Sequence, residues 1–300
     1  MDYMDYFSTE EDLSTSAQAA ELSSLLRHGD LAAVKKFLDT PNALFVHTQM
    51  NETPLHLAVH FHRSDAVKLI LNKAKEEHQL RALLDLRNRE GSTALMEAVQ
   101  QKDIESVKML LACKPRLNIT GYDYHRNALH LAAQVNSPEI IDLLLDAGMN
   151  VETPAVGAFQ MKSFRPIHFA AANFAPDAVK KLLERGADIN ARTATGATPL
   201  MVSIMYGCEG VTQDLLKYQP NLLAIDLKNH DIMHYCEWFY VTDEDRATIQ
   251  KMYDVQRKEY PQYVPPAVVA RGKQNYRHLN MKQQKVYHYI KPAPGIKARG

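Results

Sequence analysis

The sequence TPLHLA at residues 53–58 decides the fold, because related strings recur along the chain at a nearly fixed spacing. The copies are TALMEA at 93–98, NALHLA at 127–132, RPIHFA at 165–170, TPLMV at 198–202 and DIMHYC at 231–236. Measured at the histidine position, the steps are 40, 34, 38, 33 and 33 residues. Such a period indicates one supersecondary unit stacked several times, each copy burying its apolar face on its neighbours.

Each copy is expected to open a short inner helix. Thr53 can cap that helix, because its hydroxyl accepts a hydrogen bond from a free backbone N–H, and Pro54 suits the first turn, where a missing N–H loses no partner. Apolar residues at helical spacing follow the copies and predict an outer helix in each unit. These runs are VKLIL at 67–71, VKMLL at 107–111, IIDLLL at 140–145 and VKKLL at 179–183.

The motif and its period resemble those of the ankyrin-repeat family over residues 15–256. The resemblance implies an all-α solenoid of about seven stacked helix-turn-helix units with short β-hairpin loops. The flanking segments differ from the repeats. Residues 1–14 are an acidic N-terminal segment, and residues 257–300 are a basic, proline-containing tail that we expect to be extended or disordered.

Two steps exceed the common period. The step of 40 residues predicts a longer second outer helix that continues through 74–84, and the step of 38 residues predicts a longer hairpin over 151–165. Insertions in repeat proteins map to loops on one face, which is often the binding face.

Neither a membrane span nor a secretory signal is expected. No run of about 18 apolar residues occurs, and the N-terminal MDYMDY lacks the basic and apolar regions of a signal peptide. The three cysteines, Cys113, Cys208 and Cys236, are far apart, which is typical of reduced thiols. We therefore expect a monomeric protein of the cytoplasm, the nucleus or both.

The sequence predicts no enzyme, metal site or cofactor, since H-E-x-x-H, G-x-S-x-G, G-x-x-x-x-G-K and C-x-x-C patterns are absent from it. His56, His130 and His168 stand at the motif position, where the resemblance implies bonds to neighbouring backbone. His60 and His62 are two residues apart and do not share a helix face, which argues against a metal site there.

The resemblance implies a protein partner, bound through hairpin tips and the concave inner-helix surface, and hence an interaction scaffold or adaptor. Exposed apolar side chains are the candidate contacts, because aromatic residues are enriched at interface hot spots. They are Tyr122 and Tyr124 at one tip, Phe159, Met161 and Phe164 in the longer hairpin, and Phe174 and Tyr206 at the ends of inner helices. The alternative is that the longer hairpin folds back and buries its own phenylalanines.

Two asparagines are candidate modification sites. Leu182, Asp188 and Ile189 give Asn190 a context that resembles the one hydroxylated in the family by an asparaginyl hydroxylase, and Asn118 matches it less closely. The alternative, which we favour from the sequence, is that this asparagine stabilises the hairpin turn.

The formal net charge of zero hides an uneven distribution. Residues 1–12 carry five acids and no base, whereas residues 246–300 carry twelve Lys or Arg against two acids. Bases contact phosphates and aromatics stack on nucleobases, so a nucleic-acid partner is one interpretation of the tail. A solvated tail, or one that contacts an acidic protein, is favoured because no tight basic cluster occurs. The tail residues concerned are Arg271, Lys273, Arg277, Lys282 and Lys285.

Two subfamilies suggest alternative functions. Inhibitors of the NF-kappa-B type have a similar length and repeat number, which suggests a nuclear or nucleic-acid-associated regulator. The chain lacks their Asp-Ser-Gly phosphodegron, and its tail is basic where theirs are typically acidic. The C-terminal box of ubiquitin-ligase adaptors is not evident, and a substrate adaptor for a larger enzyme complex is the further alternative.

Overall fold

A computed structural model describes residues 10–122, 124–156 and 163–261 of the chain. The regular elements in these residues are helices, and they form no strand. The helices are α1 Glu10–His28, α2 Leu31–Leu38, η1 Ala43–Phe45, α3 Pro54–His60, α4 Ser64–Glu76, α5 Leu80–Asp85, α6 Ala94–Gln100, α7 Ile104–Ala112, α8 Ala128–Gln134, α9 Pro138–Asp146, α10 Pro166–Ala172, α11 Pro176–Glu184, α12 Pro199–Met205, α13 Glu209–Lys217, α14 Ile232–Trp238 and α15 Asp243–Glu259.

The chain divides into two compact units. The first takes in the described residues up to 132 together with 139–149, and the second takes in 133–138 and the described residues from 150 onward. Among all the described residues, no helix is both long enough and apolar enough to cross a membrane.

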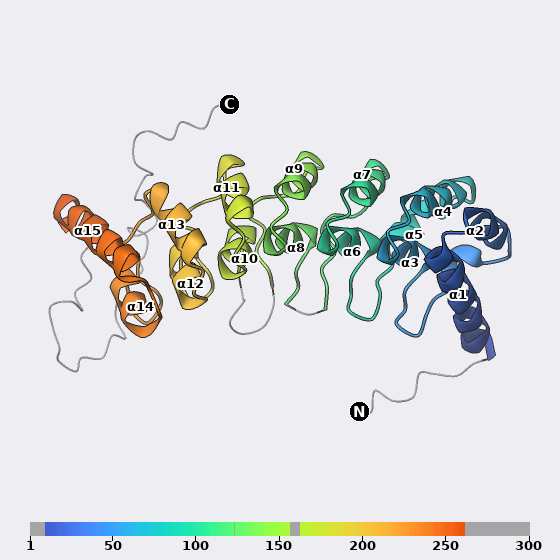
Figure 1. The fold of residues 1–300 in the computed structure, drawn as a ribbon, viewed down its shortest axis with the longest axis horizontal. Coiled ribbons are helices and arrows are strands. Elements are labelled where there is room, and N and C mark those ends of the chain that lie inside the picture. Colours follow the sequence, from blue (N-terminus) through green and yellow to red (C-terminus); the bar gives the residue numbers. More distant parts are fainter. Residues whose placement is uncertain (1–9, 123, 157–162, 262–300) are drawn as a thin grey trace. The chain divides into compact units, whose positions relative to one another are not determined.

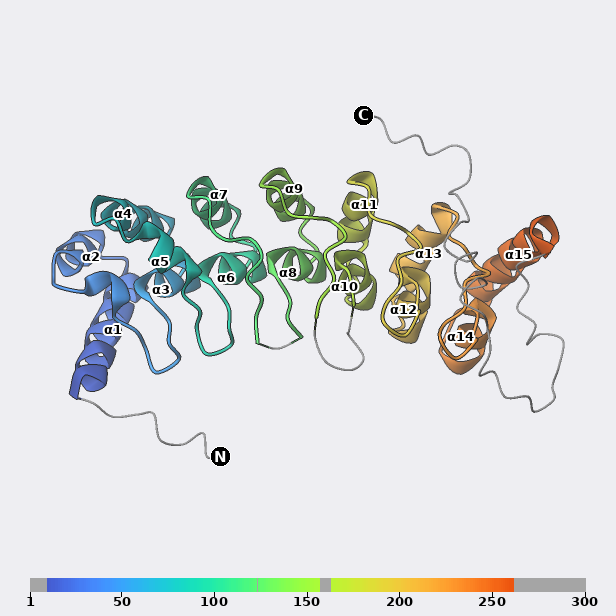
Figure 2. The same cartoon turned by 180° about the vertical axis from the view of Figure 1, so that it is seen from behind.

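Within each unit, helix pairs stack in two rows. In the first unit α1, α3 and α6 pack in series as inner helices, and α2, α4 and α7 pack in series as outer helices (Figure 1). In the second unit the inner row is α10, α12 and α14, and the outer row is α11, α13 and α15; Figure 2 shows the same rows from behind. The all-α stack of helix pairs predicted from the sequence is confirmed.

Helices α6 and α12 begin where the motif predicts, each with a threonine cap. The Thr93 hydroxyl accepts a hydrogen bond from the backbone N–H of Met96 at 3.3 Å, and the Thr198 hydroxyl does the same for Met201 at 3.3 Å. Pro54 and Pro199 occupy the first helical turn. Each cap of this kind stabilises its helix by about 1 kcal/mol.

Histidine at the motif position joins its own helix to the next loop. In the first unit, His56 Nδ1 accepts from the Thr53 N–H at 3.3 Å, so the proton sits on Nε2, which donates to the Ser92 carbonyl at 3.0 Å. In the second unit, His168 repeats this arrangement with the Arg165 N–H and the Ala191 carbonyl, both at 3.1 Å. The backbone bonds implied by the resemblance are therefore present at both histidines.

Among the described residues, the loop tips form tight turns without β-strands. One backbone bond closes each of several tips, for example Asn88 N–H to the Ser92 carbonyl at 2.9 Å and Thr193 N–H to the Ala197 carbonyl at 3.0 Å. Since no strand forms in the described residues, the hairpin part of the predicted fold is reduced to these turns.

The insertion lengthens α4 only as far as Glu76 and then forms a separate helix, so the prediction of one outer helix that continues through 74–84 is wrong. Helix α4 ends at Glu76 because His78 takes a left-handed backbone, with φ of 58°. The turn is closed by the Gln79 N–H, which donates to the Ala74 carbonyl at 2.8 Å. Helix α5 then begins at Leu80 and packs on α4.

The loop between α9 and α10 folds back on itself at its base. The Ala155 N–H donates to the Phe164 carbonyl at 2.7 Å, and the Ser163 N–H donates to the Ala155 carbonyl at 2.8 Å. The Phe164 ring is 1% exposed and packs edge-on against Phe169, with centroids 5.6 Å apart. The prediction of Phe164 as a partner contact is therefore wrong, because the ring belongs to the core of the second unit.

The buried histidines make stability depend on pH. Burial lowers the pKa of His168 to about 3, whereas the unfolded chain titrates near 6.5. A folded-state pKa below the unfolded value means that the unfolded state binds the proton first as pH falls. The contribution of His168 to stability is therefore full above pH 6.5 and declines as pH falls toward 3, by about 1.4 kcal/mol for each pH unit.

Replacing His168 with methionine (H168M) tests this account, since Met201 is buried at the same motif position. At neutral pH the variant should be less stable than the wild type, because the link to Ala191 is lost. This difference in unfolding free energy, measured by urea denaturation, should shrink between pH 7 and pH 5 by roughly 1–2 kcal/mol. A difference independent of pH would contradict a neutral buried imidazole.

Candidate partner-binding surface

Successive loop tips of the first unit are linked by backbone hydrogen bonds. The Arg89 N–H donates to the Met50 carbonyl at 2.9 Å, and the Tyr122 N–H donates to the Glu90 carbonyl at 3.0 Å. Each tip is therefore fixed by the tip before it. The turns that carry these side chains are therefore ordered before any partner binds.

Tyr122 packs so closely against Gly91 that no residue with a side chain fits at position 91. Gly91 has φ of 80°, and a Cβ there would lie 2.5 Å from the Tyr122 nitrogen and 2.8 Å from its Cγ. The guanidinium carbon of Arg87 lies 4.8 Å from the centroid of the Tyr122 ring, within cation–π range. The ring is thus held from two sides and is still 57% exposed.

Tyr124 repeats the pairing of an aromatic ring with an arginine. Its ring is exposed, and the guanidinium carbon of Arg126 lies 5.7 Å from its centroid. We call the surface formed by Arg87, Tyr122, Tyr124 and Arg126 the tyrosine tip. Tyrosine and arginine are the residue types that dominate interface hot spots.

Phe174 occupies a backbone position that disfavours it. The residue two places after the end of an inner helix has positive φ at His62, Lys102, Asn136, Phe174 and Gly207. Phe174 has φ of 52°, and its side chain is 64% exposed in the second unit. A bulky residue there stores strain of about 1 kcal/mol or more without gaining burial. Strain of this kind is typical of functional positions.

The remaining candidate residues are either partly buried or outside the described part of the chain. Tyr206 is half-buried and precedes Gly207 at the end of α12. Phe159 and Met161 lie outside the described residues, as do the five basic tail residues from Arg271 to Lys285. Tyr122 and Tyr124 belong to the first unit, and Phe174 and Tyr206 to the second, so the candidates divide between two units.

Asn190 orders the loop that follows α11 and the loop after α13. Its Oδ1 accepts from the Asn221 N–H at 2.7 Å, and its own N–H donates to Asp188 Oδ1 at 2.9 Å. The turn-stabilising role favoured from the sequence accounts for these bonds. Asn118 is exposed. Hydroxylation of either asparagine stays a prediction.

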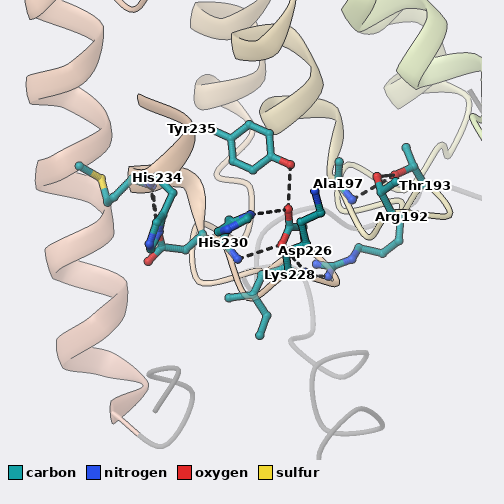
Figure 3. A network of polar contacts seen from close by, with 12 residues as sticks. Arg192, Thr193, Ala197, Asp226, Lys228, His230, His234 and Tyr235 are labelled. Carbon is teal, nitrogen blue, oxygen red and sulfur yellow. Dashed lines mark hydrogen bonds and ion pairs between the residues drawn. The ribbon is translucent and has the colours of Figure 1, made fainter. Parts of the chain in front are cut away.

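A polar network closes the last loop of the second unit. In Figure 3 the carboxylate of Asp226 lies between His230, Tyr235 and Arg192. Its Oδ1 accepts from the N–H groups of Lys228 at 2.8 Å and His230 at 2.9 Å. Its Oδ2 accepts from His230 Nδ1 at 3.0 Å and from the Tyr235 hydroxyl at 3.2 Å. The carboxylate is therefore saturated by structural bonds.

The pKa values of the titratable groups near this network favour a structural role. Burial, and next the charge of Asp226, raise the pKa of Tyr235 to about 12, so the hydroxyl stays a donor. Burial raises the pKa of the Cys236 thiol to about 11, so the thiol stays protonated and weakly nucleophilic. The Arg192 guanidinium donates to the Ile225 carbonyl and ties the preceding loop to this one.

The aromatic residues of the last unit, Tyr235, Trp238, Phe239 and Tyr240, predict from the sequence that large side chains seal the end of the stack. Trp238 and Tyr240 are instead exposed, whereas Tyr235 is buried. The Trp238 ring lies edge-on to His230, with centroids 4.4 Å apart. Helical spacing could not separate the buried from the exposed aromatic residues here, because α14 ends at Trp238 and the pattern ends with it.

Replacing Phe174 with glycine (F174G) should raise the free energy of unfolding by about 1 kcal/mol, because glycine adopts positive φ without strain. Urea denaturation of the full chain measures this change. The matched control is Gly207→Ala, whose added Cβ would meet nothing within 4 Å. The free energy of unfolding of this control should fall by a similar amount, because alanine at positive φ strains the backbone. A destabilised F174G variant would show that the Phe174 ring contributes to folding.

Comparison with known proteins agrees with the architecture. A family model for ankyrin repeats (3 copies) matches residues 19–121, 77–155, 115–193 and 167–239. The B-cell lymphoma 3 protein homolog of Mus musculus is 30% identical over 159 residues, which cover 52% of this chain and 33% of that protein. The E3 ubiquitin-protein ligase KEG of Arabidopsis thaliana is 30% identical over 186 residues, which cover 59% of this chain and 11% of that protein. The matched region is thus a third or less of either relative.

One solved structure has a similar fold. The ankyrin repeat domain of Bcl-3, described as a unique member of the IkappaB protein family, matches with a TM-score of 0.62 and 22% identity. The match covers 76% of this chain and 97% of that one, and at this identity it speaks for the fold alone. Because the family model matches overlapping stretches from residue 19 to residue 239, the chain belongs to the ankyrin-repeat family.

Proposed function

We propose that the chain is a non-catalytic scaffold or adaptor that binds a protein partner. The tyrosine tip of the first unit makes one contact surface, and Phe174 of the second unit makes another. The observation that carries the proposal is the exposed Tyr122 ring, held between Gly91 and Arg87 on a turn that is bonded to the preceding tip. We also propose that the protein acts as a monomer in the cytoplasm or nucleus.

Rigidity of the tips favours binding. A partner loses little affinity to ordering a surface that is already fixed. Tyrosine adds large contact area at low entropy cost, and its hydroxyl remains available for hydrogen bonds. The tyrosine tip combines these properties with two guanidinium groups, which suits a partner that offers carboxylates or backbone carbonyls beside an apolar pocket.

A second candidate is a regulator associated with the nucleus and with nucleic acid. The likeness to the mouse B-cell lymphoma 3 protein homolog favours it. In that case the repeats would bind a transcription factor, and the basic tail would contact phosphates. A third candidate, a substrate adaptor for a larger enzyme complex, is favoured by the likeness to an E3 ubiquitin-protein ligase.

Affinity capture from cell lysate, quantified by mass spectrometry, tests the first proposal. The bait is the full chain, and the test variant carries Tyr122→Ala and Tyr124→Ala. Loss of two hot-spot tyrosines should reduce the binding free energy of a specific partner by about 2 kcal/mol or more, which is roughly 30-fold in affinity. The partner should therefore be strongly depleted from the variant's capture.

The matched control is Tyr240→Ala, which removes an exposed tyrosine of the second unit. It should capture the same partner as the wild type. If every captured protein binds the tyrosine variant as well as the wild type, the tyrosine tip is not the binding surface. Captured material that nuclease treatment removes, and that falls steeply as salt rises, would favour the nucleic-acid candidate instead.

A further inference from the structure

Three side chains with metal-ligating atoms meet in the first unit. Glu52 lies in the loop before α3, His60 is the last residue of α3, and Glu97 lies on α6, which packs beside α3. One ligand atom from each residue lies within 4.8 Å of the other two. His60 Nδ1 and Glu97 Oε1 are 3.4 Å apart.

Glu97 leaves a buried oxygen unsatisfied among these residues. Its side chain is only 13% exposed, and its Oε2 is buried without a hydrogen-bond partner. Burial, and next the negative charges of Glu52 and Glu90, raise the pKa of the Glu97 carboxyl to about 8. A buried carboxyl group that faces other carboxylates must be neutralised by a proton or by a cation.

We propose that Glu52, His60 and Glu97 bind one divalent cation of the zinc class. One imidazole nitrogen and two carboxylate oxygens form a ligand set that zinc accepts at three of its four positions. Imidazole also suits copper and nickel, whereas calcium takes six to eight oxygen ligands, more than these residues supply. A divalent ion would offset the negative charges of both carboxylates, including that of the buried Glu97.

One pair of ligand atoms already has the spacing that a zinc ion requires. Two ligands about 2.1 Å from zinc, at the tetrahedral angle, lie about 3.4 Å from each other. The separation of His60 Nδ1 from Glu97 Oε1 equals this value. Glu52 is already oriented, because the Thr48 hydroxyl donates to its Oε2 at 2.9 Å. Outer hydrogen bonds of this kind fix the carboxylate ligands of metal sites.

The fourth position faces solvent. The His60 side chain is 52% exposed, so water or a donor atom of another molecule can complete the coordination. The ion would join the loop before α3, the end of α3 and helix α6. Because it binds the folded chain and not the unfolded one, it would stabilise the first unit by mass action.

Calorimetric titration of the full chain with zinc chloride tests the proposal, after a chelator has removed bound metal. The variants are Glu97→Gln, which keeps the shape of a protonated carboxyl, and His60→Gln. Each should bind zinc about tenfold more weakly or worse than the wild type at this site. At the same zinc concentration, the melting temperature of the wild type should also rise by more than that of either variant.

The matched control is His62→Gln, which removes an exposed histidine two residues from His60 and outside the group. It should bind zinc as the wild type does, and this separates the site from other histidines of the chain. Melting of the metal-free variants verifies that they fold. Zinc uptake by both test variants with wild-type stoichiometry and affinity, or no uptake by the wild type at micromolar zinc, would overturn the proposal.

Discussion

Two steps of the stack depend on an imidazole that serves two backbone segments at once. His56 accepts the N–H at the start of its own helix and donates to the carbonyl of Ser92 in the next loop, and His168 does the same with Arg165 and Ala191. Both rings are fully buried, so these bonds form away from water and an unmade one would be costly. The inner helix thereby sets the position of the loop that follows, and through it the position of the next tip.

Rigid tips explain how a repeat protein can carry a binding surface on loops. Gly91 admits the Tyr122 ring only because it has no side chain, and the preceding tip holds Tyr122 through its backbone. Phe174 shows the opposite arrangement. Its large ring occupies a positive-φ position that is filled by Gly207 in the next repeat. Both features put exposed aromatic area where folding does not require it. In the proposed function, the repeats provide a framework on which a few exposed side chains determine the partner.

The sequence predicted the helices well because the motif acts locally. Thr53, Pro54 and His56 each make their bonds within one turn or to the next loop, so a short string contains the information. Non-local features were left open, as the burial of Phe164 was, or missed. Burial of Phe164 depends on how a long loop returns to α10, and the end of α4 depends on the left-handed backbone of His78. The group of Glu52, His60 and Glu97 draws on three elements, so no spacing in the sequence could have indicated it.

Residue-level amide hydrogen exchange on the full chain, without any partner, tests the central claim most directly. The tips are ordered before binding if the hydrogen bonds between them persist in solution. The amides of Arg89, Tyr122 and Leu227 donate to the preceding tips at 2.9, 3.0 and 2.8 Å. These amides should exchange at least about tenfold more slowly than in an unstructured peptide. Exchange at the unstructured rate would mean that the tips become ordered only on binding, and would contradict a preformed surface.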